Sequence, residues 1–413
     1  MAERIIFHID VNSAFLSWTA AYRCSVLGEE FDLRQVASVI AGQKDSRRSI
    51  VLAKSMAAKK YGIQTGEPLG MAREKCPDLV VAEPDYNLYI SASRKLMALL
   101  RDVSPVVEQF SIDEAWVDMT GTQRLYGSPV LAAQWLKERI KRELGFTVNI
   151  GISSNKMLAK MAGELEKPDK VLTLFPWESE EKLWPLPVRE LFYVGNATEK
   201  KLHRMGIYTI GELAHAEVGD LRRKLHKHGE TIWHLANGRN ADPLQPVAAD
   251  NKGYGNAMTT PWDVTDLAYG QQVLLSLCET VAARMRRDGQ TGRCVTVQLR
   301  TSQFESFSSQ RQLPSATNGT TEIYEAACRI LEEIWDRRTP LRQMGVQLSK
   351  VSHDSYRQYS MFDTVRYDRL EKLDTAVDGI REKYGEDAIR RASVLSFENP
   401  RKGAQEVTFH VQF

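Results

Sequence analysis

Hydrophobic and polar positions in the first 175 residues alternate between short apolar runs and helical spacing. Residues 5–10 form an apolar run that ends on a carboxylate, and the stretch SAFLSWTAAYR after it has the spacing of an amphipathic helix. The same patterns predict strands at residues 36–41, 49–53 and 146–153, two strands joined at residues 111–114, and helices at residues 54–62, 89–101, 130–144 and 155–164. This alternation favours an α+β layer, a sheet with helices on one face.

The pattern changes near residue 176, and from there to about residue 238 it is helical throughout. A polar stretch with two prolines and two glycines then predicts a linker at residues 241–256. If a first strand is assumed near this linker, the elements that follow have the order β-α-β-β-α-β. Residues from 353 onward are polar and contain one helical pattern. We therefore expect an α+β multidomain protein.

Composition restricts the class of protein only weakly. A chain of 413 residues with 43% apolar residues is long enough for several domains, and a net charge of +2 neither suggests nor excludes a nucleic-acid partner. Five scattered cysteines without a C-x-x-C pair indicate reduced thiols rather than disulfides or a zinc site. The N-terminal apolar run is too short for a signal peptide, and no stretch approaches the ~20 apolar residues of a membrane span. We expect a cytoplasmic protein without a membrane partner.

Three acidic residues stand at places where strands should enter a core. Asp10 ends the first strand, and Asp113 and Glu114 lie between apolar neighbours in SIDEAWVD, which predicts the tip of a hairpin. Adjacent acids alone are common on solvated turns. A carboxylate at the end of a core strand, however, must be hydrogen-bonded, paired or bound to a metal ion.

Phosphoryl transfer at two Mg²⁺ ions requires acids of this kind. The ions lie about 3.5–4 Å apart, so their bridging carboxylates must converge from different strands. Mg²⁺ favours hard oxygen ligands and keeps several waters, so two or three acids suffice. Asp10, Asp113 and Glu114 therefore predict a two-metal site for nucleotidyl transfer.

Four segments narrow this chemistry: HIDVNSAF, AAKKYGIQTGEP, SIDEAWVD and GISSNKMLAKMAGELEKP occur in that order. Over about residues 4–350 the chain resembles the Y-family translesion DNA polymerases. The resemblance implies a right-hand polymerase with a ferredoxin-like palm, small fingers, a helical thumb and a β-α-β-β-α-β little finger. The implied divisions are palm 1–18 and 86–175, fingers 19–85, thumb 176–240, linker 241–256, little finger 257–352 and a C-terminal tail 353–413.

The resemblance also assigns roles near the acids. Asp10 and Asp113 fall at the metal ligands, together with the backbone carbonyl of Val11, and Glu114 at the ligand of the metal beside the primer 3′-hydroxyl. Phe15 falls at the steric gate, where an aromatic ring clashes with the 2′-hydroxyl of a ribonucleotide. A core aromatic is the alternative interpretation of Phe15.

Four positions bear on the nucleotide triphosphate. Lys167 falls at the lysine that contacts the triphosphate in this family. Lys59 stands where many members have an arginine, so it keeps the charge but loses the bidentate fork, and a solvated helix face is the alternative. Met56 replaces a tyrosine that often donates to the triphosphate, and Ser55 beside it is a substitute donor.

Two regions are expected to hold DNA. The segment FYVGNATEKKLHRMGIYTIGEL resembles a helix-hairpin-helix, whose tip presents backbone N–H groups to a phosphate; Gly195 and Gly206 match, whereas Tyr193 stands where a glycine is usual. A purely structural turn is the alternative. The little-finger arginines that could line a DNA backbone, or else form an ordinary charged surface, are Arg284, Arg286, Arg287, Arg293 and Arg300.

The peptide QYSMF resembles the short motif that docks on the bacterial sliding clamp. Gln358, Met361 and Phe362 match it, and Tyr359 departs from the commoner leucine. Exposed apolar side chains in a polar stretch are costly unless they meet a partner groove. The section after the peptide is not explained by catalysis, and a helical appendage packed on the little finger is one interpretation.

Together these features predict an error-prone translesion DNA polymerase without a proofreading domain. We expect it to act as a monomer on primer-template DNA with dNTPs and two Mg²⁺ ions. A nucleotidyl cyclase also uses two metals on such a palm, but it needs neither the helix-hairpin-helix nor the second α+β domain. A non-catalytic relic is the other alternative, although all three acids are present. The sequence leaves open a polymerase IV role or a polymerase V-like role with accessory proteins.

Overall fold

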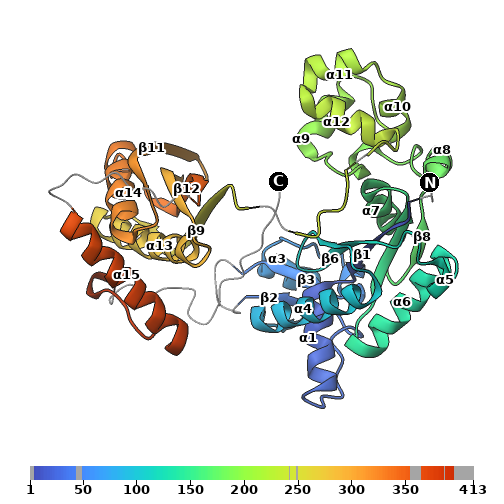
Figure 1. The fold of residues 1–413 in the computed structure, drawn as a ribbon, viewed down its shortest axis with the longest axis horizontal. Coiled ribbons are helices and arrows are strands. Elements are labelled where there is room, and N and C mark those ends of the chain that lie inside the picture. The colour runs from blue at the N-terminus through green and yellow to red at the C-terminus, as the bar shows by residue number, and fades with distance from the viewer. Residues whose placement is uncertain are drawn as a thin grey trace. The chain divides into compact units, whose positions relative to one another are not determined.

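A computed structural model describes residues 4–42, 49–240, 242–247, 250–353, 364–385 and 387–394. The chain divides into two compact units, the first ending at Ala248 and the second beginning at Ala249. In Figure 1 the first unit runs from blue to yellow-green and the second from yellow to red. Each unit has its own hydrophobic core.

The first unit is built on a five-stranded sheet with the order β5-β6-β1-β7-β8. Its strands are β1 Ile6–Val11, β5 Val107–Gln109, β6 Glu114–Asp118, β7 Val148–Ser153 and β8 Val171–Thr173. The central strand β1 is antiparallel to both β6 and β7. The predicted strands at residues 5–10 and 146–153 are thus neighbours in this sheet.

The two faces of β1 have different neighbours because side chains alternate along a strand. Phe7, Ile9 and Val11 belong to the core that also includes the helices α1 Ala14–Ser25, α4 Tyr86–Val103 and α6 Pro129–Leu144. Ile6 instead belongs to a cluster with Ala159 of helix α7, Lys156–Leu165. His8 and Asp10 share this second face by alternation, so helices cover the sheet on both faces rather than on one.

Close packing of α7 on the sheet depends on Gly151. A Cβ atom at this position would lie 2.0 Å from the Ala159 carbonyl oxygen and 2.4 Å from the Gly163 nitrogen. Gly151 is also the register partner of His8 across β1 and β7. The glycine therefore lets α7 lie directly over the polar face of β1.

The fingers and thumb complete the first unit. The fingers contain a three-stranded sheet of order β3-β2-β4, made of β2 Ser38–Ala41, β3 Val51–Lys54 and β4 Val80–Ala82, with the helices α2 Met56–Lys60 and α3 Leu69–Lys75. The thumb consists of α8 Ser179–Lys182, α9 Asn196–His203, α10 Ile210–His215, α11 Val218–Leu225 and α12 Lys227–Ala236. The predicted helical character of this region is confirmed, and its helices share one core.

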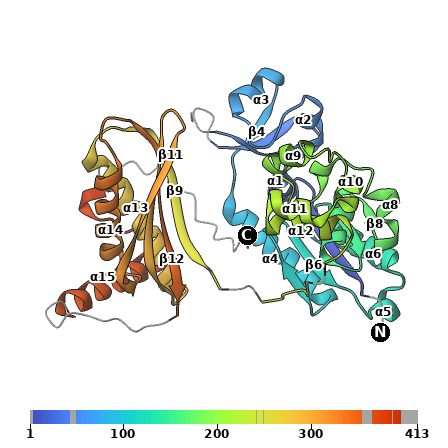
Figure 2. The same ribbon diagram turned by 90° about the horizontal axis from the view of Figure 1, so that it is seen from above.

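The second unit has the predicted β-α-β-β-α-β order. Its elements are β9 Gly253–Val264, α13 Leu267–Arg287, β10 Thr291–Thr301, β11 Ser306–Thr317, α14 Thr320–Ile334 and β12 Leu341–Ser352. The sheet order is β11-β10-β12-β9, and α13 and α14 pack on one of its faces (Figure 2). The predicted linker was too long, because β9 begins at Gly253. The first residues of β9 are rich in glycine, which is typical of a loop. Gly253 instead allows close strand packing, because a Cβ there would lie 2.8 Å from the Leu348 carbonyl of the neighbouring strand.

A final helix, α15, spans Thr364–Tyr384 and belongs to the second unit. It covers the helical pattern predicted in the tail and lies beside α13 (Figure 1). All five cysteines are free thiols, as expected. None of the helices in the described ranges is long and apolar enough to cross a membrane.

Candidate active site

The three predicted acids come together at the ends of two neighbouring strands. Asp10 lies directly opposite Glu114 in the register of β1 and β6. Asp113 immediately precedes β6, and its carbonyl accepts a hydrogen bond of 3.1 Å from the Val11 amide. A hairpin and a separate strand thus bring the three carboxylates to one edge of the palm sheet. Asp10 is 8% exposed, so its charge needs a partner.

Glu114 is held by two cationic or hydrogen-bonding side chains. His8 Nε2 lies 3.1 Å from Glu114 Oε2, and the Lys160 ammonium donates to the same oxygen. Burial by itself would raise the pKa of Glu114, but the hydrogen bond from His8 and the charge of Lys160 outweigh it and lower the pKa to about 2. Glu114 is therefore ionised at neutral pH. His8 on β1 and Lys160 on α7 fix the orientation of its carboxylate.

Asp10 is paired with Lys167, which lies beyond the C-terminal end of α7. Lys167 also contacts Glu164 at 2.7 Å, and its side chain remains 33% exposed. Burial raises the pKa of Asp10, and the Lys167 charge works in the opposite direction. Asp113 accepts a 2.6 Å hydrogen bond from the Ser111 hydroxyl, but burial again raises the pKa of this carboxyl.

Asn149 brings the Lys167 segment to Asp10. It is the register partner of Asp10 on β7, and its side-chain amide donates to the carbonyls of Gly163 at 2.9 Å and Glu166 at 2.7 Å. These bonds fasten the end of α7 to the sheet. His8, Asn149 and Lys160 were missed by sequence reasoning. The available signal was the even spacing of His8 and Asp10 on a strand, which places both on one face.

The three carboxylates are ligands of the kind that Mg²⁺ prefers. Three carboxylates supply hard oxygen ligands, and neighbouring lysines already balance the negative charge of two of them. Within the described ranges, no three His, Cys, Asp or Glu side chains converge on one point. Asp10 and Glu114 pair with Lys167 and Lys160. In chemical kind, the three carboxylates fit a divalent cation.

Phe15 lies in the first turn of α1, beside the acid cluster in sequence. Its ring is stacked on Tyr89, with centroids 4.3 Å apart and planes 5° apart, and meets the edge of Tyr86 at 6.1 Å. Phe15 is only half-buried, whereas Tyr89 is fully buried. A rigid aromatic stack therefore supports the predicted gate, and the gate role itself stays a prediction.

Ser55 has a structural role that tells against its predicted contact with a triphosphate. Its hydroxyl donates to the Val36 carbonyl at 2.7 Å and accepts from the amides of Ser38 and Ala58. It is the N-cap of α2 and is 2% exposed, so its proton is already used. Lys59 on the same helix is exposed and stays a predicted nucleotide contact.

In the thumb hairpin, a tyrosine adopts a backbone conformation that usually favours glycine. Tyr193 has a φ of 72°, in the left-handed region that favours glycine, and its side chain is 55% exposed. Gly206 also has a positive φ of 78°, and Gly195 is the N-cap of α9. A hollow of about 490 Å³ lies between this hairpin and α7, lined among others by Lys160, Phe192, Tyr193 and Gly195.

The little-finger arginines differ sharply in their surroundings. Arg286 pairs with Asp374 and Asp378 of α15 and its side chain is only 14% exposed, so its charge already has partners within the second unit and its contact with DNA stays a prediction. Arg284 donates to the Gly255 carbonyl at 3.2 Å. Arg287 is 64% exposed, and its guanidinium lies 3.8 Å from the Asp288 carboxylate. The DNA contacts of Arg284, Arg286 and Arg287 therefore all stay predictions, and the ion pairs tell against Arg286.

The open face of the little-finger sheet is polar and uncharged at its centre. Thr296 pairs with Gln310 and Gln347, and Gln298 pairs with Ser308, on the face away from the core positions Val295 and Val297. Such a face does not repel a phosphate backbone. The predicted clamp-binding residues Gln358, Met361 and Phe362 lie outside the described residues.

Comparisons with known proteins agree with this architecture. Residues 9–164 match the impB/mucB/samB family, residues 251–361 its C-terminal domain, and residues 178–207 the IMS family HHH motif. The chain is 45% identical to DNA polymerase IV of Clostridium acetobutylicum, covering 96% of this chain and 99% of the relative. It is 35% identical to DNA polymerase IV 2 of Bacillus subtilis, covering 96% of each.

A solved Y-family DNA polymerase chimera has the same fold, with a TM-score of 0.71 at 21% identity, covering 84% of this chain and 99% of the other. The sequence relatives extend over nearly the full length of the chain, and the family models match its palm, thumb and little-finger regions. The chain therefore belongs to the impB/mucB/samB family, the Y family of DNA polymerases.

Proposed function

We propose that this chain is a template-directed DNA polymerase of the error-prone translesion type, which extends a primer 3′-hydroxyl with dNTPs during lesion bypass. The observation that supports this most strongly is the set of three carboxylates at the ends of β1 and β6. Lysines from one helix and the segment after it accompany two of these acids. This arrangement suits transfer of a highly charged phosphoryl group.

In this proposal Asp10, Asp113 and the Val11 carbonyl would hold two Mg²⁺ ions, and Glu114 would be the ligand nearest the primer terminus. When bound, such ions lower the pKa of the attacking hydroxyl and neutralise the triphosphate. His8 and Lys160 keep Glu114 ionised and oriented. Lys167 moves from Asp10 to the triphosphate, which its length and partial exposure allow.

The incoming nucleotide would lie against Phe15, with Lys59 adding positive charge from the fingers. The stack of Phe15 on the buried Tyr89 leaves little freedom for the ring to retreat from a 2′-hydroxyl. Ser55 is left out of this contact because its hydroxyl is occupied by backbone groups. The grip on the triphosphate therefore depends on lysines rather than on hydroxyl donors.

Primer-template DNA is the proposed macromolecular partner. The polar centre of the little-finger sheet, the exposed Arg287 and the thumb hairpin near Gly195 are the surfaces that suit it. Binding of this kind is largely electrostatic, so it should weaken steeply with salt. We propose that the chain works as a cytoplasmic monomer.

A clamp contact through Gln358, Met361 and Phe362 is also proposed. Replacing all three by alanine should abolish stimulation of primer extension by the sliding clamp and leave clamp-independent extension unchanged. The measurement is extension with and without clamp. Equal loss of both activities would contradict a docking role.

Primer extension tests the proposed chemistry directly. Asp113→Ala should lower single-turnover incorporation by on the order of 10³-fold or more, because a metal site contributes several kcal/mol to such transition states. Glu180→Gln, a change at an exposed acid on α8, is the matched control and should leave the rate unchanged. Absence of template-dependent extension by the unmodified chain would overturn the proposal.

A further inference from the structure

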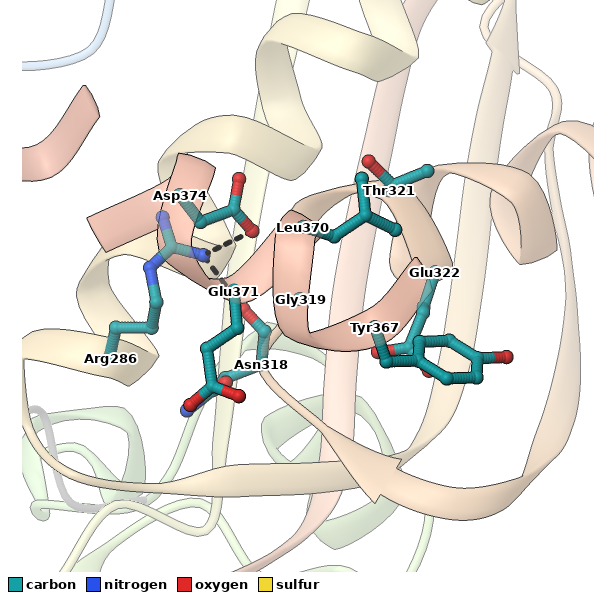
Figure 3. Close-up of a pocket in the computed structure, with 9 residues that line it drawn as sticks. All are labelled: Arg286, Asn318, Gly319, Thr321, Glu322, Tyr367, Leu370, Glu371 and Asp374. Carbon is teal, nitrogen blue, oxygen red and sulfur yellow. Dashed lines mark hydrogen bonds and ion pairs between the residues drawn. The ribbon is translucent and has the colours of Figure 1, made fainter. Parts of the chain in front are cut away.

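The helix α15 contacts the rest of the second unit through a set of charged side chains. Two oppositely charged residues of α13, Glu279 and Arg286, face it. Arg286 contacts Asp378 at 2.6 Å and Asp374 at 3.2 Å. Glu279 contacts Arg381 at 3.0 Å and also Arg391 beyond the helix at 2.9 Å. Figure 3 shows Arg286 and Asp374 directed toward each other across this seam.

Asp374 completes the N-terminus of another helix. The N-cap position of α14 is Gly319, which has no side chain to accept a backbone hydrogen bond. Asp374 Oδ2 instead accepts a 2.8 Å hydrogen bond from the amide of Thr320, the first residue of α14. Asp374 is 4% exposed and also accepts from Arg286 and Arg391. One buried carboxylate thus joins donors from three segments.

The charges specify one register and one direction. Along α13 the acid at 279 precedes the base at 286, whereas along α15 the acids at 374 and 378 precede the base at 381. The observed pairs therefore run antiparallel. A reversed α15 would place like charges together, so the charge pattern favours the observed docking over its alternatives.

Apolar side chains lie on both sides of α15. Leu373, Ile380 and Tyr384 are 47%, 37% and 66% exposed, whereas Leu370 and Val377, on the same face as Asp374, are half-buried. The cavity lined by Arg286, Gly319, Leu370 and Asp374 has a volume of about 10 Å³, room for one water at most and too little for a ligand (Figure 3). The seam is thus an interface between helices and not a small-molecule site.

We propose that α15 is a built-in partner of the little finger, docked by this charge pattern, and that the docking removes Arg286 from the surface available to DNA. Asp374 is its central residue, because it both neutralises Arg286 and caps α14. Arg286 then has a positioning role for α15, whereas its neighbour Arg287 has a side chain that is 64% exposed. The inference concerns the little finger alone and does not depend on the proposed chemistry of the palm.

Hydrogen exchange on the full chain tests the docking. Asp374→Ala should raise the exchange rates of the α15 amides and of the first turn of α14 at least tenfold, because both helices lose a buried partner. Asp368→Ala, at an exposed position of the same helix, is the matched control and should change neither. Unchanged exchange in Asp374→Ala would overturn the proposal.

A second variant separates the two roles of Asp374. Adding Gly319→Ser to Asp374→Ala supplies a local N-cap, so the first turn of α14 should regain slow exchange while α15 remains fast. This pair also keeps the test decisive if Asp374→Ala alone proves poorly folded. Recovery of α15 protection together with α14 would contradict a docking role for the carboxylate.

The DNA part of the proposal has its own measurement. Arg286→Ala should leave primer-template affinity within twofold of the original and leave the salt dependence of binding unchanged, while α15 exchange becomes fast. Each lost phosphate contact lowers the slope of log affinity against log salt by about one. A slope reduced by about one, with α15 still protected, would show that Arg286 binds DNA and would overturn the proposal. Arg287→Ala, the neighbouring control, should leave α15 protected.

Discussion

Two regions of this molecule hold buried carboxylates beside cations, but the cations differ. In the palm, Asp10 and Glu114 are paired with lysines, Lys167 and Lys160. In the little finger, Asp374 is held by two arginines and a backbone amide. A lysine is a point charge on a flexible stem, whereas an arginine makes several directed hydrogen bonds in a fixed plane.

The difference agrees with the roles proposed for the two regions, catalysis in the palm and a structural joint in the little finger. An active site must exchange its internal ion pairs for metal ions and substrate, which flexible lysines allow. A structural joint must keep one geometry, which arginine forks favour.

The largest effect should come from Lys160. Lys160→Met removes the charge that helps to keep the pKa of Glu114 near 2 and leaves the hydrogen bond between His8 and Glu114. We expect single-turnover incorporation to fall by roughly 10²-fold, since one buried charged hydrogen bond is worth about 1.5–3 kcal/mol. The KM for dNTP should change little. An unaltered rate would show that Glu114 needs no support from α7.

Lys167 tests whether a cation in the palm must be able to move. Lys167→Arg keeps the charge but offers a fork that can remain on Asp10. We expect kcat/KM for dNTP to fall about tenfold, a loss of about 1.4 kcal/mol in transition-state stabilisation. Lys170→Arg is the control, because Lys170 is 48% exposed and pairs with Glu166. Full activity in Lys167→Arg would show that the cation beside Asp10 need not be a flexible lysine.

Phe15 should act through rigidity rather than charge. Phe15→Val removes the ring stacked on Tyr89 and opens space beside the predicted sugar position. We expect the preference for dNTP over rNTP to drop at least tenfold, about 1.4 kcal/mol, with little effect on extension with dNTPs. Competition between the two nucleotide types gives the measurement. An unchanged preference would mean that Phe15 is a packing residue only.

The smallest effect is expected in the little finger. Arg286→Lys keeps the charge but cannot bond Asp374, Asp378 and the Asn318 carbonyl together. The apparent Tm should fall by about 2–4 °C, the shift that about 1 kcal/mol produces in a domain of this size. Arg287→Lys at the exposed neighbouring position serves as the comparison. If both variants melt at the same temperature as the original chain, the guanidinium of Arg286 adds nothing to stability beyond its charge.

Sequence reasoning predicted much of the fold, because strands, helices and the β-α-β-β-α-β order follow from hydrophobic spacing. It did not predict that helix α7 covers the second face of the palm sheet. This packing requires a glycine at position 151, because a Cβ there would meet the backbone of α7. The sequence alone does not show which backbone lies opposite this glycine. The start of β9 was misplaced for a similar reason, since Gly253 serves close strand packing rather than a loop.

Sequence reasoning predicted the acids of the candidate site but not the side chains that hold them. Asp10 and Glu114 are neighbours only through the register of β1 and β6, and Lys160 reaches Glu114 from a helix packed over them. The ion pairs of Arg286 were not predicted, because its partner Asp374 lies 88 positions away in the sequence. Long-range pairs of this kind are not encoded in local spacing.

The central claim is that the acids at the ends of β1 and β6 carry out DNA synthesis. The most direct measurement is single-turnover incorporation of one dNTP by Asp10→Asn, together with its affinity for primer-template DNA. We predict a loss in rate of on the order of 10³-fold with affinity within twofold of the original. Incorporation at the original rate by Asp10→Asn would contradict the claim.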